Sequence, residues 1–328
     1  MKANTLLRGA GLLLLAALAW GGLFPVAMAT LPVLDPFYMT AIRYGVTAAI
    51  FVALLVAVEG RASLSVDGRG ARVALLGSLG FAGLGLLVFI GLEHSRPEHG
   101  AIIMATQPLI AAIVAWLLKG ARPGRSTLAF LAVALIGVLL VITQGRFSGL
   151  FAGGNGLGDL LMFCGAVSWV VYTLGAGDFP KWSPLRYTAL TCVLALPAIF
   201  GVTLAATAMG YIKPPSTASV ASVGWQLTYI VSMASVLGVL SWNAGNKILG
   251  ASHGVLFINF VPVTAFTICI IQGHRFEPIE FVGAALVIAA LVGSYMVRHA
   301  ATSKPRRSAV RKPAWLGPSR GIVRGCGA

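Results

Sequence analysis

The chain has 328 residues, of which 58% are hydrophobic and only 10% are charged. A soluble domain has about 25% charged residues, so this composition excludes a soluble enzyme, a disordered protein and a disulfide-rich secreted module. The formal net charge is +15. Such an excess of basic residues is typical of proteins that bind nucleic acid or anionic lipid, and of membrane proteins whose basic residues set their orientation. With a mean hydropathy of +0.89, the composition predicts a polytopic membrane protein.

The chain contains ten apolar segments, each close to the ~20 residues that a membrane helix needs. They cover residues 8–29, 36–58, 71–92, 99–118, 127–144, 158–176, 185–209, 224–245, 252–272 and 279–298. The predicted fold class is therefore an all-α membrane protein with ten transmembrane helices. Because the connections are short, we expect the activity to lie within the helix bundle or at its ends.

The first apolar segment also has features of a cleaved signal peptide. Lys2 and Arg8 form a basic start, and Ala27-Met28-Ala29 resembles a cleavage site. The apolar run is long for a signal peptide, and a repeat described below gives it a counterpart. We therefore expect an uncleaved helix.

Lysine and arginine residues predict the orientation in the membrane. With both termini in the cytoplasm, 19 of the 24 basic residues lie on the cytoplasmic side and four on the other. This bias predicts a plasma membrane protein, such as one of a bacterial inner membrane. The basic tail 299–328 contains several prolines, and we expect it to be disordered and to bind anionic lipid rather than nucleic acid.

Two halves of the sequence resemble each other. His99-Gly100 followed by Pro108 matches His253-Gly254 followed by Pro262 at an offset of 154 residues. The expected units are 8–144 and 158–298, each with five helices. Because five is odd, the two copies must cross the membrane in opposite directions, as in the inverted repeats of many transporters.

Several short motifs resemble the EamA type of the drug/metabolite transporter superfamily. They are Trp20-Gly21, Arg43, the Gly-x7-Pro patterns that end at Pro108 and Pro262, and Gly158-Asp159 with Ser168-Trp169. The family's Gly-Glu at the ends of helices 4 and 9 is replaced by Gly120-Ala121 and Gly273-His274. The resemblance implies a ten-helix carrier of two inverted five-helix repeats around a central cavity.

From this resemblance we expect a secondary transporter, in the direction of export, for a small metabolite such as an amino acid. Alternating access of the two repeats would be its mechanism, with no cofactor or metal. The alternative is a membrane-embedded enzyme or flippase that acts on a lipid-linked substrate. Glu93, His94, Glu98 and His99 cluster in one loop and would serve as its acid and base groups. Self-association is left open.

Arg43 is the one basic residue deep within a predicted span rather than at its end, about 10 Å from the start of the helix. An ionisable residue at this depth is costly and usually faces protein or a water-filled cavity. Arg43 therefore predicts contact with an anionic part of the substrate. The alternative is a structural arginine that bonds helix-end carbonyls.

Other candidate substrate-binding residues are polar or aromatic groups within the spans. They are Trp20, Gln107, Tyr172, Trp242, Asn243 and Asn259. Gln107 and Asn259 precede prolines, which free backbone carbonyls in the preceding turn. Trp242 and Asn243 share a polar segment with Ser232, Ser235 and Asn246. The alternatives are interhelical hydrogen bonding and aromatic packing.

His99 and His253 occupy matching positions in the two halves and are candidates for carrying a coupling proton. Each stands beside a glycine at a helix start, where capping is the alternative. Asp35 and Ser183, each before a proline, predict N-caps. Asp159 is also expected to cap its helix.

Overall fold

The computed structural model describes residues 3–120, 122, 124–143, 156–250, 257–258, 260–273 and 276–303. Throughout these residues the ordered elements are helices, and no strand occurs. The first half contains α1 (Ala3–Thr30), α2 (Pro36–Glu59), α3 (Gly70–Gly77), α4 (Leu84–Glu93), α5 (Pro97–Ala105), α6 (Gln107–Lys119) and α7 (Arg125–Thr143). A short 3-10 helix, Arg61–Leu64, lies between α2 and α3.

The second half contains α8 (Gly156–Gly175), α9 (Pro184–Ala208), α10 (Thr217–Ser222), α11 (Gly224–Tyr229), α12 (Gly238–Leu249), α14 (Phe260–Ile271) and α15 (Pro278–Ser303). A 3-10 turn, Ala176–Asp178, follows α8. In the described residues, six helical stretches are long and apolar enough to cross a membrane: Asn4–Thr30, Pro36–Glu59, Gly70–Glu93, Gly156–Asp178, Pro184–Ala208 and Gly224–Leu249. Three shorter apolar helical stretches in the described part of the chain are Gln107–Leu117, Leu128–Gly137 and Pro278–Ala290.

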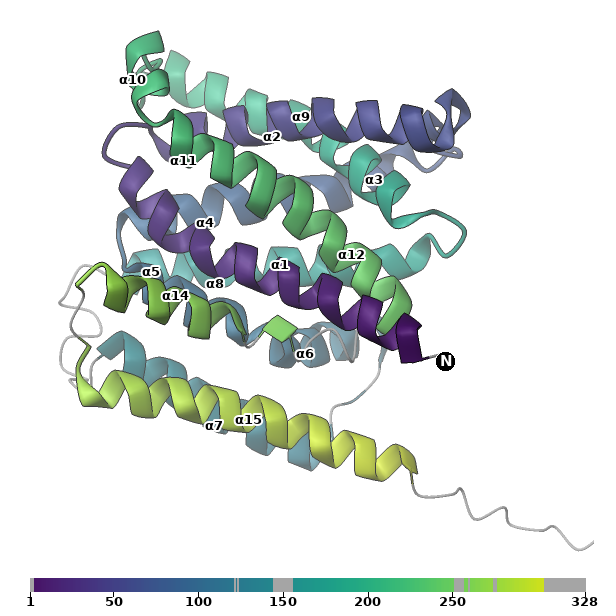
Figure 1. Cartoon of the computed structure of the whole chain (residues 1–328), viewed down its shortest axis with the longest axis vertical. Coiled ribbons are helices and arrows are strands. Elements are labelled where there is room, and N and C mark those ends of the chain that lie inside the picture. The colour runs from purple at the N-terminus through teal and green to yellow at the C-terminus, as the bar shows by residue number, and fades with distance from the viewer. Residues whose placement is uncertain are drawn as a thin grey trace, which may run out of the picture.

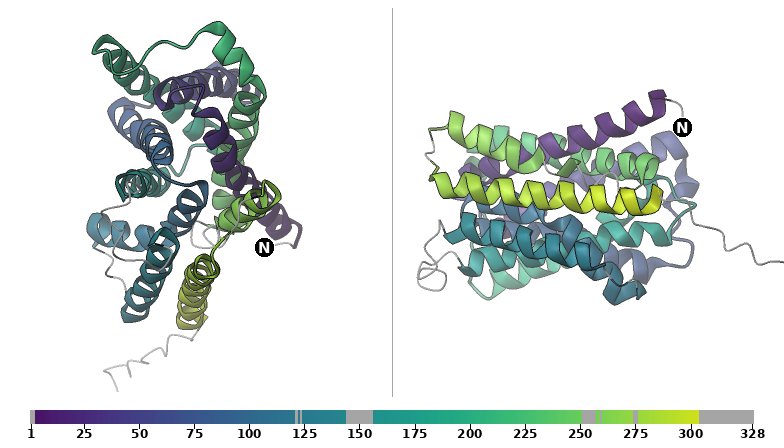
Figure 2. Two further views of the ribbon diagram at one scale, coloured as in Figure 1. Left: turned by 90° about the vertical axis from the view of Figure 1, so that its left-hand side faces the viewer. Right: turned by 90° about the horizontal axis from the view of Figure 1, so that it is seen from below.

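Many helix pairs join the first half of the chain to the second. Among them are α1 with α12, α4 with α8, α2 with α9, α1 with α14, α5 with α14 and α7 with α15. Figures 1 and 2 show α2 and α9 at one side of the molecule and α7 and α15 at the opposite side. The largest hydrophobic core contains residues of α1, α2, α4, α8, α9 and α12.

Two glycines of the third apolar stretch allow close packing between helices. A Cβ atom on Gly77 would lie 2.0 Å from the carbonyl oxygen of Thr191 in α9, and one on Gly80 would lie 2.5 Å from the ring of Tyr172 in α8. Real Cβ atoms do not approach so closely, so glycine is required where these helices meet. The packing of Tyr172 described below depends on this approach.

Helix ends agree with the sequence pattern at two positions. The Asp35 side chain accepts a hydrogen bond from the Phe37 amide, and the Ser183 hydroxyl accepts one from the Arg186 amide. Both N-cap predictions are confirmed. The prediction that Asp159 caps its helix is wrong, because α8 begins at Gly156 and the Asp159 carboxylate bonds other elements.

Three further departures from the predicted elements concern helix continuity. The segment 99–118 is two helices, α5 and α6, which meet at Thr106. Two π-helical turns, Ser78–Gly83 and Ile230–Leu237, interrupt the third apolar stretch of each half. The last helix continues to Ser303, so the tail does not begin at 299, and residues 304–328 lie outside the described part.

Candidate functional site

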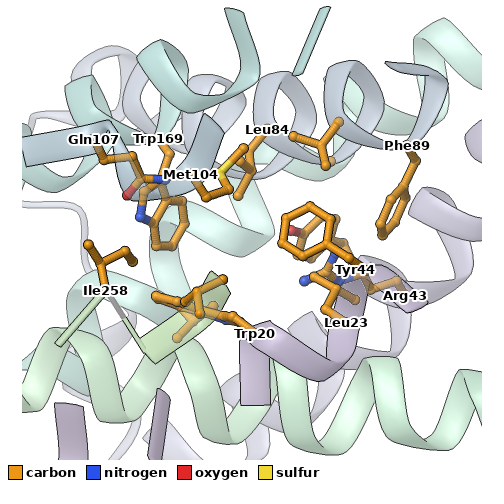
Figure 3. A pocket seen from close by; sticks show the side chains of 15 residues that line it. Trp20, Leu23, Arg43, Tyr44, Leu84, Phe89, Met104, Gln107, Trp169 and Ile258 are labelled. Carbon is orange, nitrogen blue, oxygen red and sulfur yellow. Dashed lines mark hydrogen bonds between the residues drawn. The ribbon is translucent and has the colours of Figure 1, made fainter. Parts of the chain in front are cut away.

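A mostly apolar cavity lies between α1, α2, α4, α5 and α8. It encloses about 550 Å³, which includes its open mouth. Figure 3 shows Arg43, Tyr44 and Phe89 at one end of the cavity and Gln107 and Trp169 at the other. A concave, apolar site with a few polar groups is the usual form of a small-molecule binding site.

Arg43 is the one charged residue among the described residues that line this cavity, and only 3% of its surface is exposed. Its Nε donates a hydrogen bond to the Ser235 hydroxyl at 2.5 Å. Its guanidinium carbon lies 4.7 Å from the centroid of the Tyr44 ring and 5.3 Å from that of Phe89. The bond to Ser235 fits the structural alternative for Arg43, while the cavity position fits a substrate contact.

The charge of Arg43 has no carboxylate partner among the described residues. The ion pairs of this part of the chain use other arginines and His99, and the terminal guanidinium nitrogens of Arg43 make no hydrogen bond with described groups. A buried cation without an anion is strongly unfavourable. The cavity is therefore electrostatically suited to an anionic group of a ligand.

Two tryptophans, Trp20 and Trp169, line the cavity, and a third, Trp242, packs against Trp20. The Trp20 ring lies 5.6 Å from that of Trp169 and 5.3 Å from that of Trp242. Trp20 Nε1 donates to the Ala234 carbonyl at 2.9 Å, which fixes the ring. Tyr172 lies behind Trp169, with ring centroids 4.9 Å apart. Trp20 therefore lines the cavity, whereas Tyr172 supports it from behind.

Gln107 lies in the cavity wall at the break between α5 and α6. Its Nε2 contacts only the sulfur of Met104, at 3.0 Å. Thioether sulfur is a weak acceptor, so this amide keeps most of its capacity for another partner. Asn259, the other candidate residue that precedes a proline, lies outside the described residues.

Trp242 and Asn243 are neighbours but have different surroundings. Asn243 Nδ2 donates to the Tyr172 hydroxyl at 3.1 Å and to the Thr188 hydroxyl at 2.8 Å. This amide joins α12 to α8 and α9. Trp242 is 4% exposed, and its Nε1 has no hydrogen-bond partner within the described part of the chain.

Two more cavities continue from the first toward one end of the bundle. A second cavity of about 400 Å³ shares Gln107 and Ile258 with the first. A third, of about 790 Å³, shares Thr173 and Asn246 with the second and is also lined by Lys247. The three cavities therefore form a series that leads from Arg43 to this end, which we call the basic end.

The basic end is formed by the loops around residues 60–69 and 179–183, and polar contacts join them. Trp182 Nε1 and Arg186 bond the Asp67 carboxylate at 2.8 and 2.9 Å. These two donors, Trp182 first, hold the pKa of Asp67 below its ordinary value. Arg72 pairs with Asp178 at 2.7 Å. The loops of the two halves are thus tied together beside the third cavity.

At the opposite end, a buried polar cluster joins α5 to α8. Asp159 Oδ1 accepts a hydrogen bond from the Ser95 hydroxyl at 2.5 Å and lies 3.2 Å from His99 Nδ1. His99 is 1% exposed and Asp159 is 6% exposed. His99 therefore has an acidic partner that its own sequence context did not indicate. His253 lies outside the described residues.

A second contact at this end joins Arg96 to Glu280 of α15 at 3.0 Å. Arg96 belongs to the loop whose residues would be the acid and base groups of the alternative, a membrane-embedded enzyme. Glu93 and His94 of that loop are exposed, whereas His99 is buried against Asp159. The described residues contain no group of three His, Cys, Asp or Glu side chains that would hold a metal. No observation in this part of the chain favours the catalytic alternative.

Tyr44, Phe89 and Asp159 were not predicted as site residues. Tyr44 follows Arg43 directly, and an aromatic beside a buried cation is a usable signal. Phe89 stands in an ordinary apolar run. Asp159 lies 60 residues from His99 in sequence, so no local pattern connects them.

Comparison with known proteins shows related sequences over most of the chain. The model of the EamA-like transporter family matches residues 7–143 and again 156–296. The uncharacterized transporter YrdR of Bacillus subtilis is 36% identical over 297 residues, 89% of this chain and 92% of that protein. The uncharacterized transporter YyaM of the same organism is 32% identical over 293 residues, 88% and 94% of the two chains.

A solved crystal structure also superposes on the chain, with a TM-score of 0.66 over 92% of this chain and 100% of the other. The sequence identity of that pair is 20%, so the likeness shows the fold alone. The family matches and the six long apolar helices make this a multi-pass membrane protein. The chain belongs to the EamA-like transporter family.

Proposed function

We propose that this protein is a secondary transporter that exports a small carboxylate-bearing metabolite, such as an amino acid. The observation that carries the proposal is Arg43, a buried cation without a carboxylate partner among the described residues, in a cavity otherwise lined by apolar and aromatic groups. A substrate carboxylate supplies the missing negative charge, and guanidinium groups bind carboxylates through paired hydrogen bonds.

The rest of an amino acid also fits the cavity chemically. An apolar side chain would extend away from Arg43 and pack against Leu84, Met104 and Trp169. The Gln107 Nε2, whose recorded partner is only the Met104 sulfur, supplies a further hydrogen-bond donor.

The proposed architecture is ten membrane helices in two inverted repeats, 8–144 and 158–298. The helix pairs support this architecture. If each helix is replaced by its counterpart in the other half, the pair of α1 with α12 becomes the pair of α8 with α4. The pairs of α2 with α9, α5 with α14 and α7 with α15 are unchanged by the same replacement. The π-helical turns fall in the third apolar stretch of each half. The family model also matches twice. An inverted pair of repeats provides alternating access by rocking of one half against the other.

Transport by alternating access requires contacts that close each end in turn. The loops tied by Asp67 and Arg186 at the basic end, and the contacts of Asp159 and Arg96 at the opposite end, join the two halves. We assign them to the closure of the two ends. His99 with Asp159 is the proposed carrier of a coupling proton, because each can hold a proton and the pair is shielded from water.

The proposed location is the plasma membrane with both termini in the cytoplasm, on the basis of the lysine and arginine distribution. The basic end of the bundle would then face the cytoplasm, and its contact with anionic lipid would be strengthened by the basic tail. The series of cavities that opens beside Lys247 would be the entry path for a compound that leaves the cell.

Counterflow in proteoliposomes tests this function. The probes are L-phenylalanine and L-leucine, each compared with the amine that lacks its carboxylate, phenethylamine and isoamylamine. Vesicles preloaded with unlabelled amino acid should accumulate the labelled amino acid transiently and saturably, and the amines should neither exchange nor compete. Equal exchange of acids and amines would contradict the role of Arg43. Absence of exchange with every probe would count against the proposed substrate class.

A further inference from the structure

The second cavity contains an unusual group of polar atoms. It lies between the Arg43 cavity and the basic end, and its wall includes Thr173, Trp242 and Asn246. Four polar atoms of these side chains are buried and have no hydrogen-bond partner among the described residues: Thr173 Oγ1, Trp242 Nε1, Asn246 Nδ2 and Asn246 Oδ1. These three residues come from two helices, α8 and α12, and share the wall of one cavity.

Unpaired polar atoms are costly in a protein interior. Each buried donor or acceptor without a partner destabilises the fold, whereas an apolar side chain of the same shape does not. Neighbouring side chains of the same types are paired: Asn243 bonds Tyr172 and Thr188, and Trp20 bonds the Ala234 carbonyl. Of the ten buried polar side-chain atoms without a partner among the described residues, four belong to three residues that line the second cavity.

The chemistry of these atoms defines what they would bind. Trp242 supplies a donor, Asn246 supplies a donor and an acceptor, and the Thr173 hydroxyl can do either. No described residue in the wall is charged. A carboxamide, a hydroxyl or a ring nitrogen can satisfy this set, whereas a second carboxylate or an isolated ammonium would enter a low-dielectric space without a counter-charge.

We propose that the second cavity is a binding subsite for a neutral hydrogen-bonding group of the transported compound. The proposal rests on the proposed function, because the two cavities share Gln107 and Ile258 in their walls. The substrate class becomes a monocarboxylate that also carries an amide, hydroxyl or ring nitrogen. Compounds with two negative charges are excluded.

Three variants test the subsite, and two of them are close to the native side chain in shape. Thr173→Val and Asn246→Leu replace unpaired polar atoms by apolar ones, and Trp242→Phe removes the indole donor. The matched control is Asn243→Leu, which removes an amide that the structure pairs with two hydroxyls. The probes are L-glutamine, L-methionine and L-glutamate, which have similar lengths but carry an amide, an apolar and a charged end.

The wild-type protein should bind L-glutamine more tightly than L-methionine and should not bind L-glutamate, as judged by ligand-induced thermal shift and by competition in counterflow. Asn246→Leu should weaken the binding of L-glutamine by about tenfold, which is the effect of one net hydrogen bond of about 1.4 kcal/mol. It should leave the binding of L-methionine unchanged. Equal losses for both probes, or equal binding of L-glutamate, would overturn the proposal.

A second measurement needs no ligand. Thr173→Val and Asn246→Leu should melt at the same temperature as the wild type or higher, because they remove unpaired polar atoms, whereas Asn243→Leu should melt lower. Lower melting of Thr173→Val and Asn246→Leu would show that these groups stabilise the fold and would overturn the subsite. Absence of binding by all three probes to a wild-type protein with this melting pattern would instead count against the proposed function.

Discussion

Replacing Ser235 by alanine should destabilise the protein because it removes the hydrogen-bond partner of Arg43. The guanidinium is 3% exposed and its Nε bonds the Ser235 hydroxyl at 2.5 Å. A hydrogen bond to a charged group contributes about 1.5–3 kcal/mol. At about 2.1 cal/mol/K of unfolding entropy per residue, this corresponds to a fall in melting temperature of about 2–4 °C for a chain of this length.

The assay is thermal unfolding of purified protein in detergent, followed by tryptophan fluorescence. Ser232→Ala is the matched control, since the Ser232 hydroxyl bonds only the Thr228 carbonyl of its own helical stretch; it should stay within about 0.5 kcal/mol of the wild type. In an Arg43→Met background, the Ser235→Ala substitution should have little further effect, because the buried cation is gone. An undiminished effect in that background would refute the assigned contact.

Three other outcomes follow from the packing and the polar contacts. Gly80→Ala should lower the melting temperature, with a loss of about 1–3 kcal/mol, because its Cβ would lie 2.5 Å from the Tyr172 ring; unchanged melting would contradict this close approach. The Asp67 carboxylate, whose pKa is lowered in the folded state, should stabilise the fold at neutral pH and lose this effect below about pH 4. Asp67→Asn should therefore reduce the loss of melting temperature on acidification. The same dependence of melting temperature on pH in the variant and the wild type would contradict this role of Asp67. Asp159→Asn should retain counterflow at one pH but lose its pH dependence if His99 and Asp159 share a coupling proton; a wild-type pH profile would exclude them.

Local sequence patterns predicted much of the fold because membrane helices and their ends depend on nearby residues. The six long apolar helices and the caps at Asp35 and Ser183 follow from runs of apolar residues and from Pro after a capping side chain. The break at Thr106 agrees with the effect expected of Pro108 on the preceding turn. The π-helical turn at Ile230–Leu237 was not predicted, since no simple residue pattern specifies it.

The site was harder to predict because its contacts join distant parts of the chain. Arg43 and Trp20 were candidates because their residue types are unusual in a span, and both line the first cavity; their contact with a substrate stays a prediction. The extra residue in the π-helical turn changes the helical register, so Ser235 meets Arg43 while Ser232 bonds its own helix. The partnership of His99 with Asp159 depends on the packing of α5 against α8, which no local periodicity encodes.

The most direct test of the account is the half-saturating concentration of L-phenylalanine in counterflow for Arg43→Gln compared with the wild type. Loss of the guanidinium removes a charge-assisted contact of about 2–3 kcal/mol, which predicts a roughly 30–150-fold increase. Arg43→Lys, which keeps the charge but not the paired geometry, should give an intermediate value. A correctly folded Arg43→Gln protein with the wild-type half-saturating concentration would contradict the claim that Arg43 binds the substrate carboxylate.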